Sequence, residues 1–183
     1  KVYGIGPMFR RERPQKGRYR QFNQINFEIF GSNDYFSDLE LICVANDILK
    51  SILPKNELIL NINSLGSRAN LSEYKTKLSK YFIDNKQKLS ADSVNKIHLN
   101  PLRILDSKNE NDICISKNAP MINEFINKDS KNHYEKIKDG LKFYNIKFIE
   151  NFNLVRGLDY YTHTAFEITS GALGSQATVC GGG

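Results

Sequence analysis

The stretch MFRRERPQKGRYRQFNQINFEIFG, residues 8–31, decides how this chain folds. Its last part alternates between two kinds of side chain, which is typical of a strand with one buried face. One face is apolar: Ile25, Phe27 and Ile29. The other face can stack on a ring or form hydrogen bonds: Phe22, Gln24, Asn26, Glu28 and Phe30. We therefore predict a strand with a buried face and a ligand-binding face.

The residues before this strand alternate as well. Residues 3–12 place Tyr3, Ile5, Pro7 and Phe9 opposite Met8, Arg10 and Glu12. The segment between the two alternating runs contains Pro14 and Gly17, which are frequent in turns. This order predicts a long antiparallel hairpin with a very basic tip. Its exposed face would carry Arg10, Glu12, Gln24 and Glu28.

These residue types suit a ligand that is both anionic and zwitterionic. Arginine presents a planar fork of donors to phosphate or carboxylate oxygens. Gln24 and Glu28 can accept hydrogen bonds from an ammonium or a ring N–H, and Phe22 offers a plane for a purine. The alternative is an edge hairpin decorated with solubilising charges. The regular alternation of polar and large apolar residues in both strands argues against that alternative.

The hairpin sequence resembles motif 2 of the class II aminoacyl-tRNA synthetases, specifically that of the histidyl-tRNA synthetase family. The resemblance is carried by residues 6–10, 13–22 and 24–28. A second resemblance runs from Leu154 through Glu167, which is similar to the histidine-specific motif of the same family. Residues 173–182 are similar to its next strand, whose glycines would let a ligand lie against bare backbone. The family resemblance covers nearly the whole chain.

Composition limits the class of protein. The chain has 183 residues, 40% of them hydrophobic, which is typical of a globular protein with one core or a core plus a small insertion. It contains neither an apolar run long enough to cross a bilayer nor a signal-peptide pattern. Its three cysteines are widely spaced, and we expect the scattered His98, His133 and His163 to be surface or packing residues. We therefore expect a cytoplasmic protein without a membrane partner or a metal site of its own.

The net charge of +6 is concentrated on two segments. Residues 1–31 contain seven Lys and Arg against two acidic residues, and residues 65–150 contain sixteen against eleven. Such segments are consistent with phosphate-rich partners. A solvated, Lys-rich surface explains the second segment equally well.

The rest of the chain predicts an α+β fold, an antiparallel sheet flanked by helices, with a helical insertion. Ser37 and Glu40 form a capping-box pattern that would begin a helix, and residues 58–63 read as a buried strand. We predict three parts along the chain: residues 1–67, the first part of the catalytic core; residues 68–145, the helical insertion; and residues 146–183, the second part of the core. Within the insertion we predict a helix with Leu71, Tyr74, Leu78 and Phe82 on one face, a shorter helix after Ser90, and helices over residues 120–127 and 130–144. In the last helix, Tyr134, Ile137 and Leu141 should face inward.

The resemblance implies a two-step reaction. L-Histidine and ATP, which carries Mg²⁺, would give histidyl-adenylate, and the histidyl group would then pass to the tRNA for histidine. The residues implied in catalysis are Arg10 and Arg156. Those implied in histidine binding are Gln24, Glu28, Arg156, Tyr160 and Tyr161, with Gly182 and Gly183 as weaker candidates. Those implied in ATP binding are Arg10, Glu12, Arg18, Tyr19 and Phe22.

The resemblance also implies what should lie outside this chain. In the family, motif 1 and the homodimer interface should precede Lys1, and motif 3 and the anticodon-binding domain should follow Gly183. We therefore expect a central fragment of the catalytic domain, inactive by itself. The alternatives are the histidine-sensing regulatory subunit of ATP phosphoribosyltransferase, a synthetase-like sensor domain of a kinase, and a plain nucleic-acid-binding module. The last would explain Lys16 and Arg20 but not Glu28.

Overall fold

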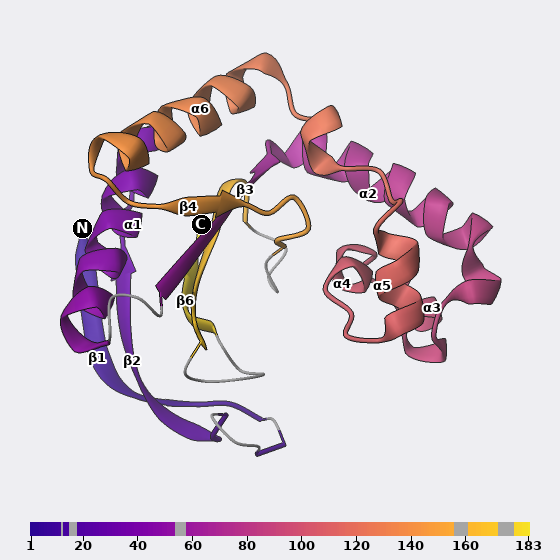
Figure 1. Cartoon of the computed structure of the whole chain (residues 1–183), viewed down its shortest axis with the longest axis horizontal. Coiled ribbons are helices and arrows are strands. Elements are labelled where there is room, and N and C mark those ends of the chain that lie inside the picture. Colours follow the sequence, from indigo (N-terminus) through magenta and orange to yellow (C-terminus); the bar gives the residue numbers. More distant parts are fainter. Residues whose placement is uncertain (12, 15–17, 54–57, 156–160, 172–177) are drawn as a thin grey trace.

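The computed structural model describes residues 1–11, 13–14, 18–53, 58–155, 161–171 and 178–183. Two antiparallel strands form the predicted hairpin: β1 (Val2–Phe9) and β2 (Gln21–Glu28). A second sheet contains four strands in the order β4 (Phe148–Glu150), β3 (Leu58–Gly66), β5 (His163–Ser170) and β6 (Thr178–Gly182) (Figure 1). The predicted fold class is confirmed. One edge strand departs from the antiparallel pattern, because β4 pairs parallel to β3.

Two long helices cover one face of the four-stranded sheet. They are α1 (Tyr35–Ile52) and α6 (Lys128–Phe143), which lies across the top of Figure 1. Leu60 and Ile62 of β3 lie opposite Ile168 and Phe166 of β5, so these four side chains share the face beneath the helices. The helices contribute buried apolar residues to the same cluster: Leu39, Ile42, Ala45, Leu49, Tyr134, Ile137 and Leu141. The inward face predicted for the helix that forms α6 is confirmed.

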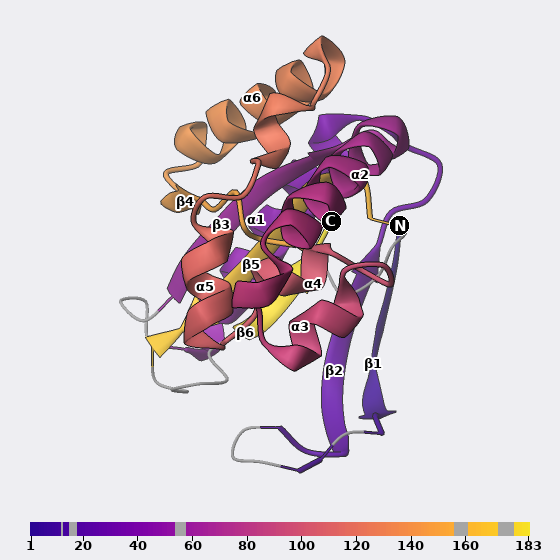
Figure 2. The same cartoon turned by 90° about the vertical axis from the view of Figure 1, so that its right-hand side faces the viewer.

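The helices between β3 and α6 form a second cluster. They are α2 (Arg68–Asp84), α3 (Ala91–Lys96), α4 (Leu102–Leu105) and α5 (Glu110–Ser116), joined by the 3₁₀ turns η2 (Lys86–Lys88) and η3 (Ile122–Glu124). In Figure 1 they lie to the right of the sheet, and Figure 2 views the molecule from that side. The stripe along α2 is buried as its spacing predicts: Leu71, Tyr74, Leu78 and Phe82.

The two clusters divide the chain near residue 127. Ile122 and Ile126 belong to the second cluster, whereas Tyr134 and the rest of the α6 stripe belong to the first. The predicted limits of the insertion, residues 68–145, stay a prediction. The packing shows that α6 lies on the sheet as α1 does.

The helix predicted over residues 120–127 is wrong, because only the short turn η3 forms there. The hydroxyl of Tyr74 donates a hydrogen bond of 2.9 Å to the Pro120 carbonyl. The Glu124 amide donates instead to Met121, three residues back, which is the 3₁₀ pattern.

The predicted start of α1 at Ser37 is also wrong. The N-cap is Asp34, whose carboxylate accepts a 2.9 Å hydrogen bond from the Phe36 amide. Ser37 lies inside the first turn, where its amide donates to the Asp34 carbonyl and its hydroxyl contacts Ser32. Both Asp and Ser are good N-caps. The earlier residue caps the helix here because Ser32 accepts from the Asp34 amide and holds the preceding turn.

Most of the apolar face of the hairpin is exposed, contrary to the predicted buried face, although Phe27 and Ile29 are half-buried. The exposed fractions are 75% for Tyr3, 71% for Ile5, 74% for Phe9 and 43% for Ile25. The hairpin forms its own two-stranded sheet, and none of its described residues belongs to the cluster beneath α1 and α6. An ion pair of 2.7 Å between Lys1 and Glu40 links it to α1. Among the described residues, none of the helices combines the length and apolar character needed to cross a bilayer.

Candidate functional site

The register of the hairpin places four of the predicted site residues on one face. Glu28, Gln24 and Phe22 alternate along β2 and lie opposite Val2, Gly6 and Met8. The Arg10 amide donates a 2.9 Å hydrogen bond to the Arg20 carbonyl, which extends the pairing beyond β1. Because side chains repeat every two residues in a strand, Arg10 falls on the same face as the other three.

Arg10 and Phe22 are in direct contact. The guanidinium carbon lies 4.1 Å from the centroid of the Phe22 ring, within the range of a cation–π interaction. The Nε of Arg10 donates a 2.9 Å hydrogen bond to the Tyr19 carbonyl. These two contacts fix the Arg10 side chain. The terminal N–H groups of its guanidinium are hydrogen-bond donors that suit an anionic ligand.

Two glycines of β1 lie opposite polar residues of β2. Gly4 lies opposite Asn26 and Gly6 lies opposite Gln24. A methyl group built on either glycine would meet no atom within 4 Å, so the hairpin is open above β1. The Gln24 amide donates a hydrogen bond to the Asn26 side chain, which orients Gln24 along the strand. The sequence analysis did not select Gly4 and Gly6, although their alternation with Tyr3 and Ile5 is a usable signal.

Tyr161 lies just before β5, where it is half-buried beside the end of β6. A methyl group on Gly183 would lie 3.0 Å from the Tyr161 ring and 2.2 Å from the Thr164 carbonyl oxygen. A methyl group on Gly182 would lie 2.7 Å from the Phe166 ring. The packing of β6 on β5 therefore explains why both positions are glycine, and their contact with a ligand stays a prediction.

The remaining predicted residues divide into two groups. Tyr19 is 65% exposed and contributes its carbonyl to Arg10, and Arg18 is half-buried beside it. Glu12, Arg156 and Tyr160 lie outside the described residues. The structure thus places Arg10, Phe22, Gln24 and Glu28 on one hairpin face and Tyr161 on the four-stranded sheet.

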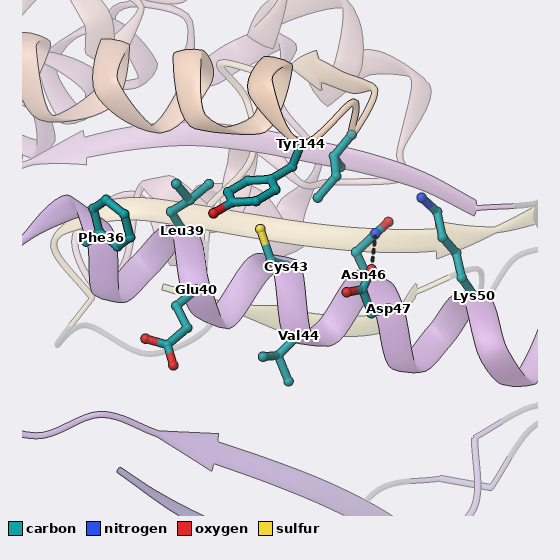
Figure 3. Close-up of a pocket in the computed structure, with 10 residues that line it drawn as sticks. Phe36, Leu39, Glu40, Cys43, Val44, Asn46, Asp47, Lys50 and Tyr144 are labelled. Carbon is teal, nitrogen blue, oxygen red and sulfur yellow. Dashed lines mark hydrogen bonds between the residues drawn. The ribbon is translucent and has the colours of Figure 1, made fainter.

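A cavity of about 370 Å³ lies between α1 and the segment that follows α6, and none of the predicted site residues that the structure describes lines it (Figure 3). It is lined by Phe36, Leu39, Glu40, Cys43, Val44, Asn46, Asp47, Lys50, Tyr144 and Ile146. Asn46 donates a 3.1 Å hydrogen bond to Asp47 at its wall. Burial and the nearby Asp47 raise the pKa of the Cys43 thiol, so this thiol is a poor nucleophile at neutral pH.

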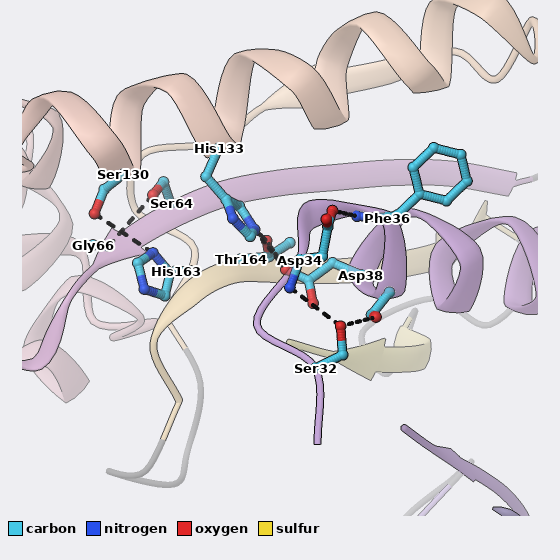
Figure 4. Close-up of polar contacts among 11 residues, drawn as sticks. Ser32, Asp34, Phe36, Asp38, Ser64, Gly66, Ser130, His133, His163 and Thr164 are labelled. Atoms are coloured by element: carbon cyan, nitrogen blue, oxygen red, sulfur yellow. Dashed lines mark hydrogen bonds and ion pairs between the residues drawn. The ribbon is translucent and has the colours of Figure 1, made fainter. Parts of the chain in front are cut away.

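Sequence reasoning missed a polar cluster that joins α1, α6 and β5 (Figure 4). Asp38 accepts hydrogen bonds from His133 Nε2 at 2.9 Å and from the Thr164 hydroxyl at 2.5 Å. The rings of His133 and His163 are stacked, with centroids 5.1 Å apart and planes 28° apart. Burial, and secondly the neighbouring His133, lower the pKa of His163, while Asp38 opposes this shift. We predicted these histidines to be surface or packing residues, and the structure makes them one contact group.

The sequence of this chain is similar to one family of known proteins. Residues 1–181 match the family model described as "tRNA synthetase class II core domain (G, H, P, S and T)". The chain is 53% identical over its whole length to a histidine–tRNA ligase of Prochlorococcus marinus strain MIT 9301. It spans 43% of that relative's length.

Solved structures agree with this similarity. The apo histidyl-tRNA synthetase of S. aureus superposes with a TM-score of 0.72 at 37% identity, over 99% of this chain and 42% of that chain. A Bacillus halodurans structure described as an ATP phosphoribosyltransferase regulatory subunit/histidyl-tRNA synthetase shares the fold, with a TM-score of 0.58 at 20% identity. That match covers 98% of this chain and 49% of that chain.

Proposed function

Because the chain belongs to the class II tRNA synthetase core-domain family, we propose that it is the central part of the catalytic domain of a histidine–tRNA ligase. The full-length ligase would activate L-histidine with ATP and transfer the histidyl group to the tRNA for histidine. The relatives named above suggest this amino acid, and this chain spans 43% of the first of them. The observation that carries the proposal is the open hairpin face with Arg10, Phe22, Gln24 and Glu28.

Histidine recognition is assigned to two opposed hydrogen-bonding groups. A neutral imidazole has one N–H donor and one acceptor nitrogen. The exposed Glu28 carboxylate would accept from the N–H, and the Tyr161 hydroxyl would donate to the other nitrogen. Gln24, held by Asn26, would meet the α-amino group. Tyr160 is a further candidate for the pocket wall.

ATP recognition is assigned to the other end of the same hairpin face. Arg10 would hold the α-phosphate and Phe22 would stack on adenine, so the contact between the two side chains suits one nucleotide bound across both. Arg18 would reach the outer phosphates with Tyr19 beside it, and Glu12 would lie near the adenine amino group or near the Mg²⁺ of the nucleotide. Arg156, as a permanent cation, would bridge the α-phosphate and the histidine carboxylate.

In the first step a histidine carboxylate oxygen attacks the α-phosphorus, and the bond to the β-phosphate oxygen breaks as pyrophosphate leaves. Two anions must approach each other, so the protein mainly supplies positioning and positive charge. In the second step a ribose hydroxyl at the tRNA 3′ end attacks the acyl carbon, and AMP leaves.

The Mg²⁺ that accompanies ATP is expected to stay on the nucleotide. Magnesium sites in nucleotide enzymes use one or two carboxylates together with the phosphates. In the part of the chain that the structure describes, the hairpin ligand face offers one carboxylate, Glu28, and no group of three side chains could hold a metal ion. Glu12, which lies outside the described residues, is the further carboxylate that we propose for contact with the Mg²⁺ of the nucleotide.

We further propose that the full-length ligase is a cytoplasmic homodimer whose partners are L-histidine, ATP and tRNA. The regulatory subunit of ATP phosphoribosyltransferase remains the second candidate, since a structure with that description shares the fold. The presence of Arg10, Gln24, Glu28, Arg156 and Tyr161 together favours the ligase.

The test is amino-acid-dependent exchange of pyrophosphate into ATP, measured on the full-length ligase with each of the twenty amino acids. Exchange that depends on histidine alone is expected, followed by charging of the tRNA for histidine. Absence of exchange, together with histidine-dependent regulation of an ATP phosphoribosyltransferase catalytic subunit, would establish the regulatory alternative instead.

A further inference from the structure

We infer that His163 is a positioning residue for the histidine site, which holds the start of β5, and with it Tyr161, against α6 and α1. The inference rests on the proposed function, because Tyr161 is assigned there to the imidazole of the substrate. His163 itself is not placed in contact with any ligand.

The backbone of His163 is unusual for a residue with a side chain. Its φ is +53°, in the left-handed region that glycine and asparagine adopt most easily. The opposite strand is irregular at the same level, because the pairing shifts between Ser64 and Gly66, and Gly66 has φ +66°. Irregularities of this kind redirect side chains at the ends of strands. A non-glycine residue keeps such a conformation only when its surroundings hold it there.

The positive φ brings two consecutive side chains to the same neighbour. In a regular strand His163 and Thr164 would point to opposite faces. Here the His163 ring stacks on His133 at 5.1 Å, and the Thr164 hydroxyl lies 3.4 Å from His133 Nε2 (Figure 4). His163 Nδ1 also lies 3.5 Å from the Ser130 hydroxyl, one turn before His133 on α6.

The contacts of His133 connect this group to α1. Its Nε2 lies 2.9 Å from Asp38, which also accepts from Thr164. Tyr35, at the start of α1, contacts the His133 ring edge-on with centroids 6.4 Å apart. Three elements distant in sequence are thus joined where β5 begins.

The packing around Gly183 connects the start of β5 to Tyr161. The Thr164 carbonyl oxygen and the Tyr161 ring both border the position where a methyl group on Gly183 would lie, at 2.2 and 3.0 Å. Tyr161 is therefore packed between the start of β5 and the end of β6, two residues from His163. If the His163 ring were absent, the start of β5 would keep the contact of Thr164 with His133 but lose the ring stack and the contact with Ser130. Tyr161 would then be held less firmly relative to β6.

Two substitutions separate the ring from the backbone. His163→Gly keeps the left-handed conformation without cost but removes the stack and the contact with Ser130. His163→Asn also tolerates this conformation and keeps a polar group near the place of Nδ1. In the full-length ligase we expect His163→Gly to raise the KM for histidine about tenfold, the scale of one lost aromatic contact and one hydrogen bond. The KM for ATP should stay within about twofold. His163→Asn should raise the KM for histidine less than His163→Gly does, because a polar group near Ser130 is kept while the stack is lost.

His133→Ala provides a test of the route. It should raise the KM for histidine like His163→Gly, and the double variant should be no worse than the single ones, because all three lose the same contact. Additive effects would contradict the shared route. Equal losses for His163→Gly and His163→Asn, equal increases of both KM values, or a lower stability with an unchanged KM for histidine would each overturn the inference.

Amide hydrogen exchange on the 183-residue chain tests the positioning without any activity measurement. The amides of residues 161–165 should exchange faster in His163→Gly than in the wild type, whereas those of α2 should be unchanged. Unchanged exchange at residues 161–165 would refute the positioning even in an active ligase. Faster exchange there, combined with a full-length protein that shows no histidine-dependent pyrophosphate exchange, would refute the proposed function and leave the positioning intact.

Discussion

Replacing Asp112 by asparagine should release the small helices α3 to α5 from one another. Asp112 lies in α5 and is fully buried. Its carboxylate accepts four hydrogen bonds, from the Ser90 amide at 2.8 Å and from the hydroxyls of Ser90 at 2.8 Å, Ser93 at 2.6 Å and Ser107 at 2.7 Å. The charge is compensated by these donors, which come from the N-terminal end of α3 and from the loop before α5.

The expected loss of stability in Asp112→Asn follows from the hydrogen-bond donors and from the pKa of Asp112. Burial by itself would raise the pKa of Asp112, but the hydrogen bonds from Ser93, Ser90 and Ser107 outweigh it and hold the pKa at about 2. Relative to the ordinary value of 3.8, this shift corresponds to about 2 kcal/mol of preference for the charged form. An asparagine side chain has the same shape but one acceptor oxygen, so it leaves some donors unpaired. We expect a loss of about 2–3 kcal/mol in local stability, the scale of charge-assisted hydrogen bonds.

The assay is amide hydrogen exchange at residues 90–116 of the 183-residue chain at neutral pH. The expected loss corresponds to exchange about 30- to 150-fold faster at the slowest amides of this segment. The control is Asp106→Asn, a nearby exposed carboxylate whose replacement should have little effect. Equal exchange rates in Asp112→Asn and wild type would refute the view that this carboxylate holds the helices together.

Four further predictions concern other parts of the molecule. Gly140→Ala should destabilise the chain by about 1–3 kcal/mol in urea unfolding, because its methyl group would lie 2.2 Å from Leu39. Because burial and His133 lower the pKa of His163 below 6.5, the folded state favours neutral His163. This contribution to stability is full above about pH 6.5 and is lost as the pH falls below it, and His163→Asn should remove it from the pH dependence of the melting temperature. In the full-length ligase, Arg156→His should fold normally, keep much of its histidine affinity and lose about 10²–10³ in activation rate; a loss of stability with an unchanged rate would indicate a structural ion pair. The 183-residue chain alone should give no measurable pyrophosphate exchange, since it spans 43% of the first relative's length, and robust exchange would show that the rest is dispensable.

Residue patterns within single segments were enough to predict the hairpin and two of the long helices. The hairpin follows from alternation on both sides of Pro14 and Gly17, and α2 and α6 follow from apolar residues at helical spacing. The start of α1 was missed because Asp34 and Ser37 are both competent caps, and the choice depends on the turn at Ser32. In these cases the error is a few residues.

Tertiary contacts explain the larger differences. The parallel direction of β4 is set by its pairing with β3, about ninety residues earlier, which no local pattern encodes. The cluster of Asp38, His133 and His163 joins residues 95 and 30 positions apart in sequence, so each looked like an isolated polar residue. The hairpin alternates as predicted, but it forms a separate two-stranded sheet, so its apolar face lies outside the core of the four-stranded sheet. The row from Arg10 to Glu28 could be predicted because one hairpin register places all its members.

The central claim is that the polar hairpin face recognises histidine through Glu28. The most direct measurement is histidine-dependent pyrophosphate exchange by Glu28→Ala in the full-length ligase, compared with Asn23→Ala, which alters an exposed residue on the opposite face of the same strand. We predict that Glu28→Ala lowers kcat/KM for histidine by about 10⁴-fold, because a site built to bind a polar group loses that much discrimination without its partner. The KM for ATP should change little, and Asn23→Ala should behave like the wild type. Near-normal histidine activation by Glu28→Ala would contradict the account.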